Sequence, residues 1–324
     1  MQRREFLSLV GGAAVAWPVV ARAQQSPKVL RIGITTVQPR NSPPYVALDQ
    51  RLRELGYVDG QNLAVDFLNP DTVAGGIGEA MRILVRNKVD VIVATVESAL
   101  KAALAATDSV PIVMIAIDYD PISQGYIKSL ARPTGNVTGL FLQQIELAAK
   151  RLQLLKDAVP DLQAATMFWD ASSAAQWKTT ASAATSIGFR LAGIELQRQP
   201  YDYEKALAQA PPSHRRALIM PTSAVFYRDR RQLADLAIRH RMASMFVLRE
   251  WVDDGGLLSY GASFPSMFRR AAEYIDKIAR GTNPTDLPIE QPTKFEFVIN
   301  LKTAKAIGLE FHPQLLARAD EVIE

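Results

Sequence analysis

A chain of 324 residues with 48% hydrophobic residues and no cysteine is long enough for two lobes, whose cores must hold without disulfides. The lack of cysteine also excludes thiolate metal sites and cysteine nucleophiles. The first 23 residues carry three arginines and one glutamate, so the remainder has 34 lysines and arginines against 32 acidic residues. These charges are interspersed without a dense basic stripe, and we expect no nucleic-acid partner.

The first residues have the order of a bacterial export signal. Arg3 and Arg4 match the core of a twin-arginine signal, residues 7–20 form an apolar run, and an A-x-A cleavage site ends at Ala23. The run is shorter than the about 20 residues that span a bilayer, and no cysteine follows that could carry a lipid. We therefore predict a cleaved signal peptide over residues 1–23 and a product free in the periplasm.

Beyond the signal, short β-branched apolar runs alternate with amphipathic segments, a pattern typical of a parallel α/β sheet. The first series predicts strands at 30–35, 63–67, 89–95, 112–117 and 137–140. Its predicted helices are at 45–55, 78–87, 98–107 and 123–130. Together these elements predict one doubly wound lobe.

A second series of similar plan follows. It predicts helices at 146–159, 174–187, 203–209 and 230–240, and strands at 164–169, 190–195, 217–220 and 245–248. Gly56, Gly188 and Gly281 each follow a predicted helix and are expected as C-terminal caps. No long linker separates the two series, so short crossings are expected to form a hinge. The expected division is 28–141 plus 251–288 for the first lobe and 142–250 plus 289–324 for the second.

Three stretches resemble one protein family. The tail QPTKFE at 291–296, continuing as FVINLKTAKAIGL and ending LLARADEVIE, closely resembles the C-terminus of the ABC transporter substrate-binding family, which includes tryptophan- and tyrosine-type binding proteins. GGLLSYG at 255–261 and SLARPTGNVTGL at 129–140 are similar to two further signatures of this family. The resemblance covers essentially the whole chain after the signal.

The resemblance implies a type I periplasmic-binding fold, in which two doubly wound lobes are joined by three crossovers and hold a ligand in the cleft between them. It implies a monomeric binding protein and not an enzyme, without cofactor or metal. Its ligand would be a small polar solute, such as an amino acid or aromatic acid, and its partner an ABC permease of the inner membrane. One departure is Glu97, in a turn where family members often carry a small Gly-Thr-Pro-like stretch. This glutamate would repel a ligand carboxylate unless it faced solvent.

Ligands of open α/β sheets bind beyond the carboxyl ends of the strands, and this rule selects the candidate ligand-binding residues. In the first lobe the candidates are Thr36, Val37, Thr95, Ser98, Asp118 and Tyr119. In the second lobe they are Trp169, Asp170, Thr222, Ser223, Phe226 and Arg249.

Several candidates have a structural alternative. Thr95 and Ser98 stand at an expected helix start, where they either bind an anion or serve as ordinary caps. Asp118 either binds a ligand ammonium group or is a turn residue. The aromatic candidates either wall the cleft or belong to the core. Arg249 either binds a ligand carboxylate or pairs with Glu250 in a salt bridge.

Enzyme signatures are absent from the sequence. The three histidines, His214, His240 and His312, have no partner at metal-ligand spacing. No P-loop, dinucleotide fingerprint or Gly-x-Ser-x-Gly elbow occurs. A transport-associated binding protein is the favoured interpretation. Two alternatives stay open: a sensory binding protein that presents its solute to a membrane receptor, and an unrecognised hydrolase or isomerase in a two-lobed scaffold.

Overall fold

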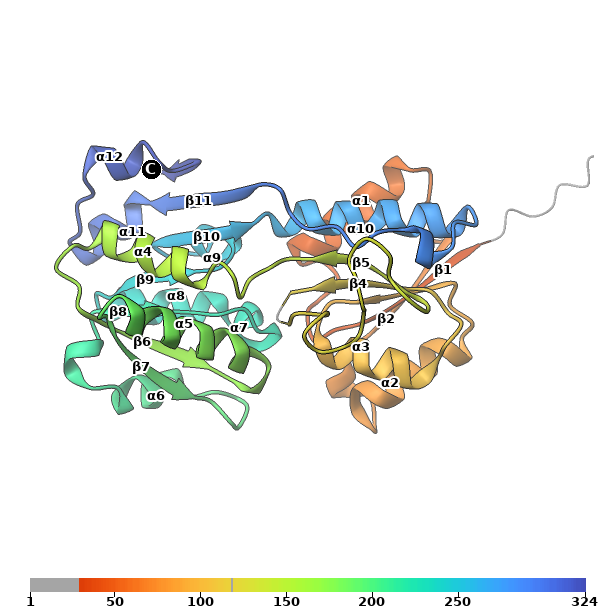
Figure 1. The fold of residues 1–324 in the computed structure, drawn as a ribbon, viewed down its shortest axis with the longest axis horizontal. Coiled ribbons are helices and arrows are strands. Elements are labelled where there is room, and N and C mark those ends of the chain that lie inside the picture. Colours follow the sequence, from red (N-terminus) through yellow and green to blue (C-terminus); the bar gives the residue numbers. More distant parts are fainter. Residues whose placement is uncertain (1–28, 118) are drawn as a thin grey trace, which may run out of the picture.

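The computed structural model describes residues 29–117 and 119–324, which form two α/β lobes joined end to end (Figure 1). The predicted signal peptide and the candidate Asp118 lie outside the described residues. No helix among the described residues is both long and apolar enough to cross a membrane.

The first lobe is built on a five-stranded parallel sheet with the order β2-β1-β3-β4-β5. Its strands are β1 (Leu30–Thr35), β2 (Leu63–Leu68), β3 (Val91–Ala94), β4 (Ile112–Ala116) and β5 (Val137–Phe141). Its helices are α1 (Pro43–Glu54), α2 (Gly76–Arg86), α3 (Glu97–Ala106) and α10 (Phe264–Ala279). Every residue of β3 and β4 is buried, because helices cover both faces of the sheet.

One predicted helix of this lobe, at 123–130, does not form. The Asp120 carboxylate accepts a hydrogen bond from the backbone N–H of Ile122 at 2.8 Å, which closes a turn at the start of the segment. Gly125 then takes a φ of +76°, outside the helical range. The segment is therefore a series of turns, and the prediction of a helix was wrong.

The second lobe carries a seven-stranded sheet with the order β12-β11-β10-β9-β8-β6-β7. Its strands are β6 (Ala164–Trp169), β7 (Arg190–Glu195), β8 (Ala217–Ile219), β9 (Ala243–Phe246), β10 (Leu258–Ala262), β11 (Phe295–Asn300) and β12 (Glu321–Ile323). Its helices are α4 (Ala148–Ala158), α5 (Ala174–Ser186), α6 (Tyr203–Gln209), α7 (Ala224–Arg228), α8 (Arg230–Arg239), α9 (Arg249–Asp253), α11 (Leu301–Ile307) and α12 (Pro313–Leu316). β11 is antiparallel to β10 and parallel to β12, so the last two strands run against the rest. The predicted class, two doubly wound lobes, is confirmed with this one local reversal.

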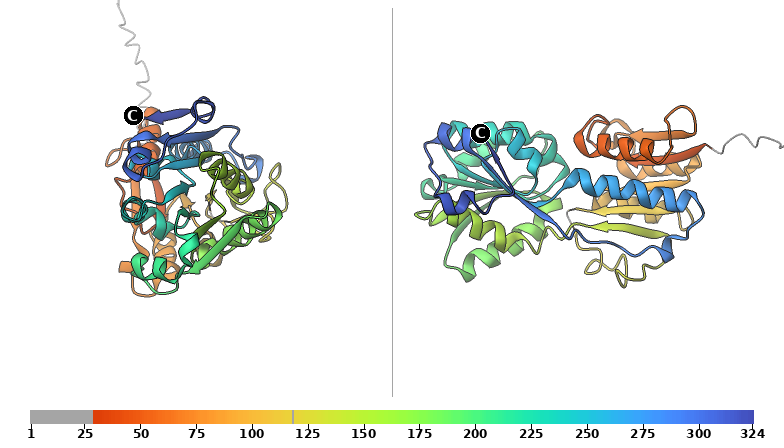
Figure 2. Two further views of the ribbon diagram at one scale, coloured as in Figure 1. Left: turned by 90° about the vertical axis from the view of Figure 1, so that its left-hand side faces the viewer. Right: turned by 90° about the horizontal axis from the view of Figure 1, so that it is seen from above.

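The chain crosses between the lobes three times: at 142–147, at Ser263 and at 291–294 (Figures 1 and 2). Two of the predicted switch points were misplaced. Residues 251–262 stay in the second lobe, because β10 pairs with both β9 and β11. At the return crossing, Glu290 still belongs to the first lobe, since its N–H donates to the carbonyl of Gly139 at 3.0 Å.

Helix ends follow the glycine signals. Gly188 lies two residues after the end of α5 with a φ of +66°, and its N–H donates to the carbonyl of Thr185 at 3.1 Å. We expect Gly188→Ala to lower the free energy of unfolding by about 1 kcal/mol, because an L side chain is disfavoured at positive φ. Urea denaturation measures this. The control is Gly78→Ala, within α2 and with open space around an added Cβ, which is expected to be neutral or stabilising. Equal destabilisation by both changes would contradict the assignment.

Candidate functional site

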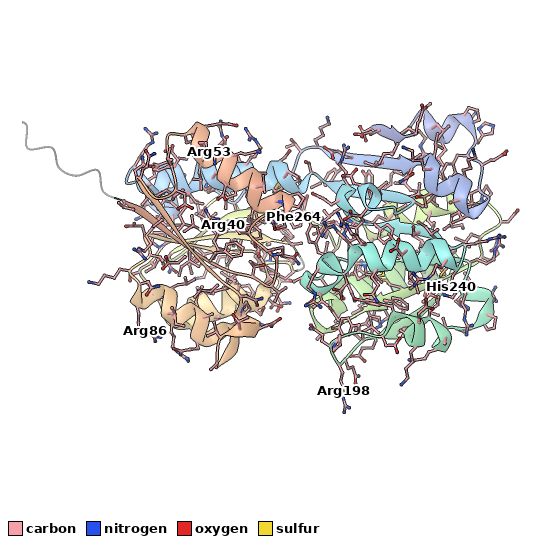
Figure 3. The ribbon with its side chains drawn as sticks, turned by 180° about the vertical axis from the view of Figure 1, so that it is seen from behind. Arg40, Arg53, Arg86, Arg198, His240 and Phe264 are labelled. Carbon is pink, nitrogen blue, oxygen red and sulfur yellow. The ribbon has the colours of Figure 1, made fainter. Side chains whose placement is uncertain are left out.

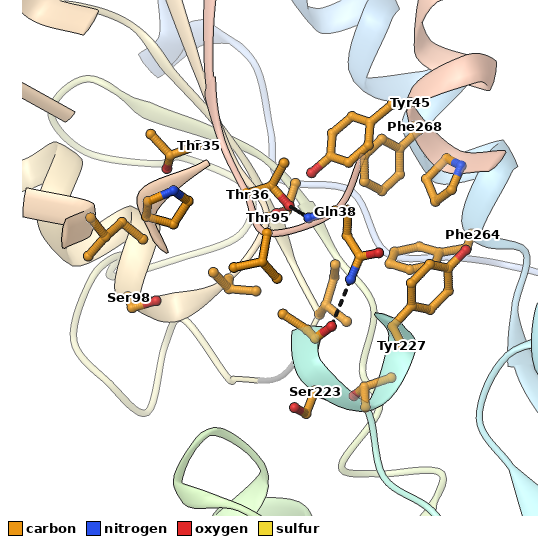
Figure 4. A pocket seen from close by; sticks show the side chains of 18 of the residues that line it. Thr35, Thr36, Gln38, Tyr45, Thr95, Ser98, Ser223, Tyr227, Phe264 and Phe268 are labelled. Atoms are coloured by element: carbon orange, nitrogen blue, oxygen red, sulfur yellow. Dashed lines mark hydrogen bonds between the residues drawn. The ribbon is translucent and has the colours of Figure 1, made fainter. Parts of the chain in front are cut away.

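A cavity of about 330 Å³ lies between the two lobes (Figure 4). In the first lobe it is bounded by the carboxyl ends of β1 and β3 and by the helices α1 and α10. In the second lobe it is bounded by the loop after β8, the start of α7 and the start of α9. This is the position at which ligands bind to open α/β sheets, beyond the carboxyl ends of the strands.

Aromatic side chains from both lobes form much of the cavity wall. The five rings that line it belong to Tyr45, Tyr227, Trp251, Phe264 and Phe268. Three edge-to-face contacts link four of them: Tyr45 to Phe268 at 5.1 Å, Phe268 to Phe264 at 5.2 Å, and Phe264 to Tyr227 at 5.5 Å. The last contact joins the lobes, and Figure 3 shows Phe264 at their junction. An apolar or aromatic ligand surface would complete this wall.

Hydroxyl groups of the first lobe face the aromatic wall. The side chains of Thr36, Thr95 and Ser98 line the cavity, and the Tyr45 ring lies beside the two threonines (Figure 4). Burial raises the pKa of Tyr45, and hydrogen bonding with Thr36 and Thr95 opposes that rise. The Tyr45 hydroxyl is therefore neutral at physiological pH and can exchange hydrogen bonds with these threonines.

One hydrogen bond crosses the cavity from lobe to lobe. The Gln38 side chain, in the loop after β1, donates through Nε2 to the carbonyl of Ala224 at 2.7 Å (Figure 4). Its own N–H donates to Thr36 Oγ1 at 3.1 Å, which orients the loop. The glutamine thus ties the two lobes together at the cavity.

We expect Gln38→Ala to favour separation of the lobes, because this cross-lobe bond is lost. A neutral hydrogen bond contributes about 1 kcal/mol, so ligand affinity should fall roughly fivefold. Calorimetric titration measures the affinity, and small-angle scattering should show a larger radius of gyration without ligand. Gln153→Ala, which removes an exposed bond to Asp157 within α4, is the matched control. An unchanged affinity and radius would show that the bond does not stabilise closure.

A second cavity of about 420 Å³ adjoins the first. The two share the wall formed by Val96, Ser98, Ser223 and Ala224. Unlike the first, the second contains several charged residues, namely Glu97, Lys101 and Asp170. Within the described ranges no cluster of three or more His, Cys, Asp or Glu side chains is placed to hold a metal ion.

Glu97 faces this second cavity in an ion pair. Its carboxylate lies 2.9 Å from Lys101 Nζ and accepts a hydrogen bond from the Tyr126 hydroxyl at 2.7 Å. Burial, followed by the Glu97 hydrogen bond, raises the pKa of Tyr126. Because Lys101 balances its charge, Glu97 repels an anion less than the sequence alone suggested.

The structure brings seven of the twelve predicted residues to these two cavities. Six line the first cavity: Thr36, Val37, Thr95, Ser98, Thr222 and Ser223. Asp170 lines the second cavity, together with Ser98 and Ser223. They converge because each follows the carboxyl end of a strand in a parallel sheet.

Two aromatic candidates belong to the packed core instead. Tyr119 is 4% exposed and packs edge-to-face on Tyr126, with centroids 5.9 Å apart. Phe226 is fully buried against Tyr201 and Tyr203. Both follow a strand, but their side chains turn into the lobe and away from the cavities. Neither residue lines the two cavities to which the structure brings the other candidates.

The two remaining candidates lie on other surfaces. Trp169 stacks on Trp177 at 6.0 Å with nearly parallel rings. Arg249 donates to Glu321 at 2.6 Å and to Asp253 at 3.3 Å, so its partners are these residues and not Glu250. Neither side chain lines the cavities, because local partners on the second lobe hold each in place.

Sequence reasoning missed the five aromatic residues of the wall. Tyr45 and Phe268 lie within helices, and Phe264 begins α10 directly after the second crossover. Tyr227 and Trp251 lie in the short helices α7 and α9 that follow β8 and β9. The rule that ligands bind beyond the carboxyl ends of strands selects only residues of the loops, so it does not find these rings. In the sequence, the two phenylalanines at 264 and 268 were the signal that could have indicated an aromatic wall.

Two doubly wound lobes, three crossings and a cavity between facing strand ends define the type I periplasmic-binding fold. The chain belongs to the ABC transporter substrate binding protein family, which matches residues 45–323. It is accordingly a binding protein and not an enzyme.

The chain is similar in sequence or structure to several proteins whose names or structures are known. The chain is 24% identical over 264 residues to a tyrosine-binding protein of Clostridioides difficile, covering 80% of this chain and 74% of that protein. A Streptococcus pneumoniae ABC domain in complex with L-Trp superposes with a TM-score of 0.78 at 22% identity, covering 90% and 99% of the two chains. A conserved domain protein from Vibrio cholerae gives a TM-score of 0.80 at 20% identity, covering 91% and 100%.

Proposed function

We propose that this chain is the exported, periplasmic solute-binding component of an ABC uptake system, and that it holds a small solute with an apolar or aromatic part in the first cavity. The observation that carries this proposal is the wall of aromatic rings contributed by both lobes. A ligand that buries a ring there contacts both lobes at once, so its binding favours closure. The closed form then docks on the permease.

The named relatives support an aromatic ligand. One is a tyrosine-binding protein and another was crystallised with L-Trp. In this chain the five lining rings and the cavity of about 330 Å³ are of suitable chemistry and size for one aromatic ring system. The proposed periplasmic location depends on the predicted signal peptide over residues 1–23.

Small-angle scattering and calorimetric titration with a panel of aromatic and aliphatic solutes test the proposal. We expect saturable binding of aromatic members and a smaller radius of gyration on saturation. Phe264→Ala should weaken binding about 10- to 100-fold, because a ring that contacts both lobes is removed. The control is Phe311→Ala, a partly buried ring near the C-terminus of the second lobe. Binding of aliphatic solutes alone, or saturation without compaction, would reject the proposed clamp.

A further inference from the structure

The charges around the two cavities are predominantly negative. The only charged residue that lines the first cavity in the described part of the chain is Asp71. The second cavity adds Glu97, Asp170 and one cation, Lys101. Lys101 lies 2.9 Å from the Glu97 carboxylate, which offsets its charge. The joined site therefore has three carboxylates, those of Asp71, Glu97 and Asp170, against one ammonium group among the described lining residues.

Asp170 is the most deeply buried of these carboxylates. It is 4% exposed, and Oδ1 accepts hydrogen bonds from Ser172 Oγ at 2.8 Å, Ser173 N–H at 3.1 Å and Ser173 Oγ at 3.0 Å. Oδ2 accepts one from Ser223 Oγ at 2.6 Å. No lysine, arginine or histidine of the described residues forms an ion pair with Asp170 within 4.0 Å. Its donors are mainly hydroxyl groups, and they leave the negative charge without a cation.

A buried charge is ordinarily paired, because removing an ion from water costs several kcal/mol. Every donor to the Asp170 carboxylate is neutral: the serine groups named above and the Tyr201 hydroxyl, which is hydrogen-bonded to Asp170. Asp170 lines the second cavity, and its hydrogen-bond donor Ser223 lines both cavities, so this carboxylate lies where the two cavities meet. A cationic group bound in the second cavity would lie beside this carboxylate and could take the place of the Tyr201 hydroxyl as a donor.

The Tyr201 ring adds a second feature that suits a cation. Tyr201 lines the second cavity beside Asp170. Burial and, after it, the charge of Asp170 and the hydrogen bond with its carboxylate raise the pKa of Tyr201 to about 12, which keeps the hydroxyl neutral. The faces of aromatic rings attract ammonium groups, and a neighbouring carboxylate strengthens the site.

We propose that the ligand is an amphipathic cation, an aromatic amine or aminoamide, whose ring occupies the first cavity and whose positively charged nitrogen pairs with Asp170 in the second. A free carboxylate is not required. This inference rests on the proposed function, because it specifies the charge of the solute held in that same cleft.

Calorimetric titration with three matched ligands tests the inference: tyramine, its neutral alcohol analogue tyrosol, and tyrosine. Tyramine should bind about 10- to 100-fold more tightly than tyrosol, as expected for a hydrogen bond between charged groups. Tyramine should also bind at least as tightly as tyrosine, because the excess of carboxylates around the site disfavours a ligand carboxylate.

Two variants locate the charge. Asp170→Asn keeps the shape of the side chain and should reduce tyramine binding to the level of tyrosol, while leaving tyrosol binding unchanged. Glu310→Gln, which removes an exposed carboxylate outside both cavities, is the matched control and should leave the affinities for tyramine and tyrosine within about threefold of their original values. If Asp170→Asn does not fold, the comparison of ligands on the unaltered chain decides the question.

The possible failures are distinguishable. Tyrosol binding as tightly as tyramine, or tyrosine binding tenfold more tightly than tyramine, would overturn the cation assignment and leave the aromatic solute-binding function intact. Equal loss of tyramine and tyrosol affinity in Asp170→Asn would make Asp170 a structural residue and also overturn the assignment. Absence of binding by all three ligands would reject both the assignment and the proposed aromatic specificity.

Discussion

Replacing Arg151 by methionine is expected to lower the free energy of unfolding by about 3 to 5 kcal/mol, because buried carbonyl groups of the hinge lose a charged donor. Arg151 lies on α4 and is 5% exposed. It donates to the carbonyl of Tyr260 at 2.8 Å, to the carbonyl of Gln144 at 3.0 Å and to the Gln144 side chain. Burial lowers its pKa to about 9, so it remains charged at neutral pH.

The two partners of Arg151 lie at or beside different crossings. Gln144 lies in the first crossover, next to Gln143 with its positive φ of 54°, and Tyr260 lies in β10 just before the second. Arg151 therefore holds two hinge segments together, and its loss should also broaden the range of lobe orientations.

Urea denaturation and small-angle scattering measure the two effects of the Arg151 change. Lys150→Met is the matched control, because Lys150 is the exposed neighbour on the same helix. We expect less than about 0.5 kcal/mol for that control. A loss below 1 kcal/mol for Arg151→Met, with unchanged scattering, would show that the hinge does not depend on this arginine.

The second large effect is a pH dependence of stability that comes from Glu250. This residue follows Arg249 at the start of α9 and is 6% exposed. Neither of its carboxylate oxygens has a hydrogen-bond partner on another described residue, and only its own backbone N–H lies close enough to favour the charged form. Burial raises its pKa to about 7, Asp253 and Glu296 add to the rise, and Arg230 opposes it. Arg230 is itself paired with Asp254 at 2.6 Å.

The sign of the effect follows from proton binding. Between pH 4.5 and pH 7 the folded protein holds a proton on Glu250 that the unfolded chain has lost, so stability falls as pH rises through this range. From pH 4 to pH 8 the loss amounts to about 3 kcal/mol. We expect the Glu250→Gln variant to lack this decline, because glutamine does not titrate.

The measurement is urea denaturation of the native chain and of Glu250→Gln at several values between pH 4 and pH 8. The difference in unfolding free energy between the two should change by about 3 kcal/mol over this range in favour of the variant. Glu310→Gln, an exposed residue near the C-terminus, is the control and should leave the slope unchanged. Parallel curves for the native chain and Glu250→Gln would contradict a raised pKa.

Local patterns predicted most strands and helices of this fold. The predicted strands β1, β4 and β6 are largely buried in their sheets, and Gly188 ends α5 at positive φ as expected. The failures occur where neighbouring elements decide the conformation. β10 was assigned to the wrong lobe because only its pairing with β9 and β11 reveals its sheet.

The candidate site shows the same division. Thr95, Ser98 and Asp170 could be chosen from the sequence because the few residues that follow a parallel strand, up to the start of the next helix, lie at one edge of the sheet. Tyr119 and Phe226 meet the same rule and yet point into the core, since the direction of a loop side chain depends on what packs beside it.

The sequence by itself determined the two-lobed α/β plan, because hydrophobic periodicity and glycine caps act over a few residues. It also determined the family, through motifs spread along the chain. Only the tertiary structure decided which aromatic rings line the cleft, that Lys101 forms an ion pair with Glu97, and that Asp170 has neutral donors and no ion-pair partner among the described residues. These features depend on distances between residues far apart in the chain, and such distances are set by packing between lobes and not by local propensity.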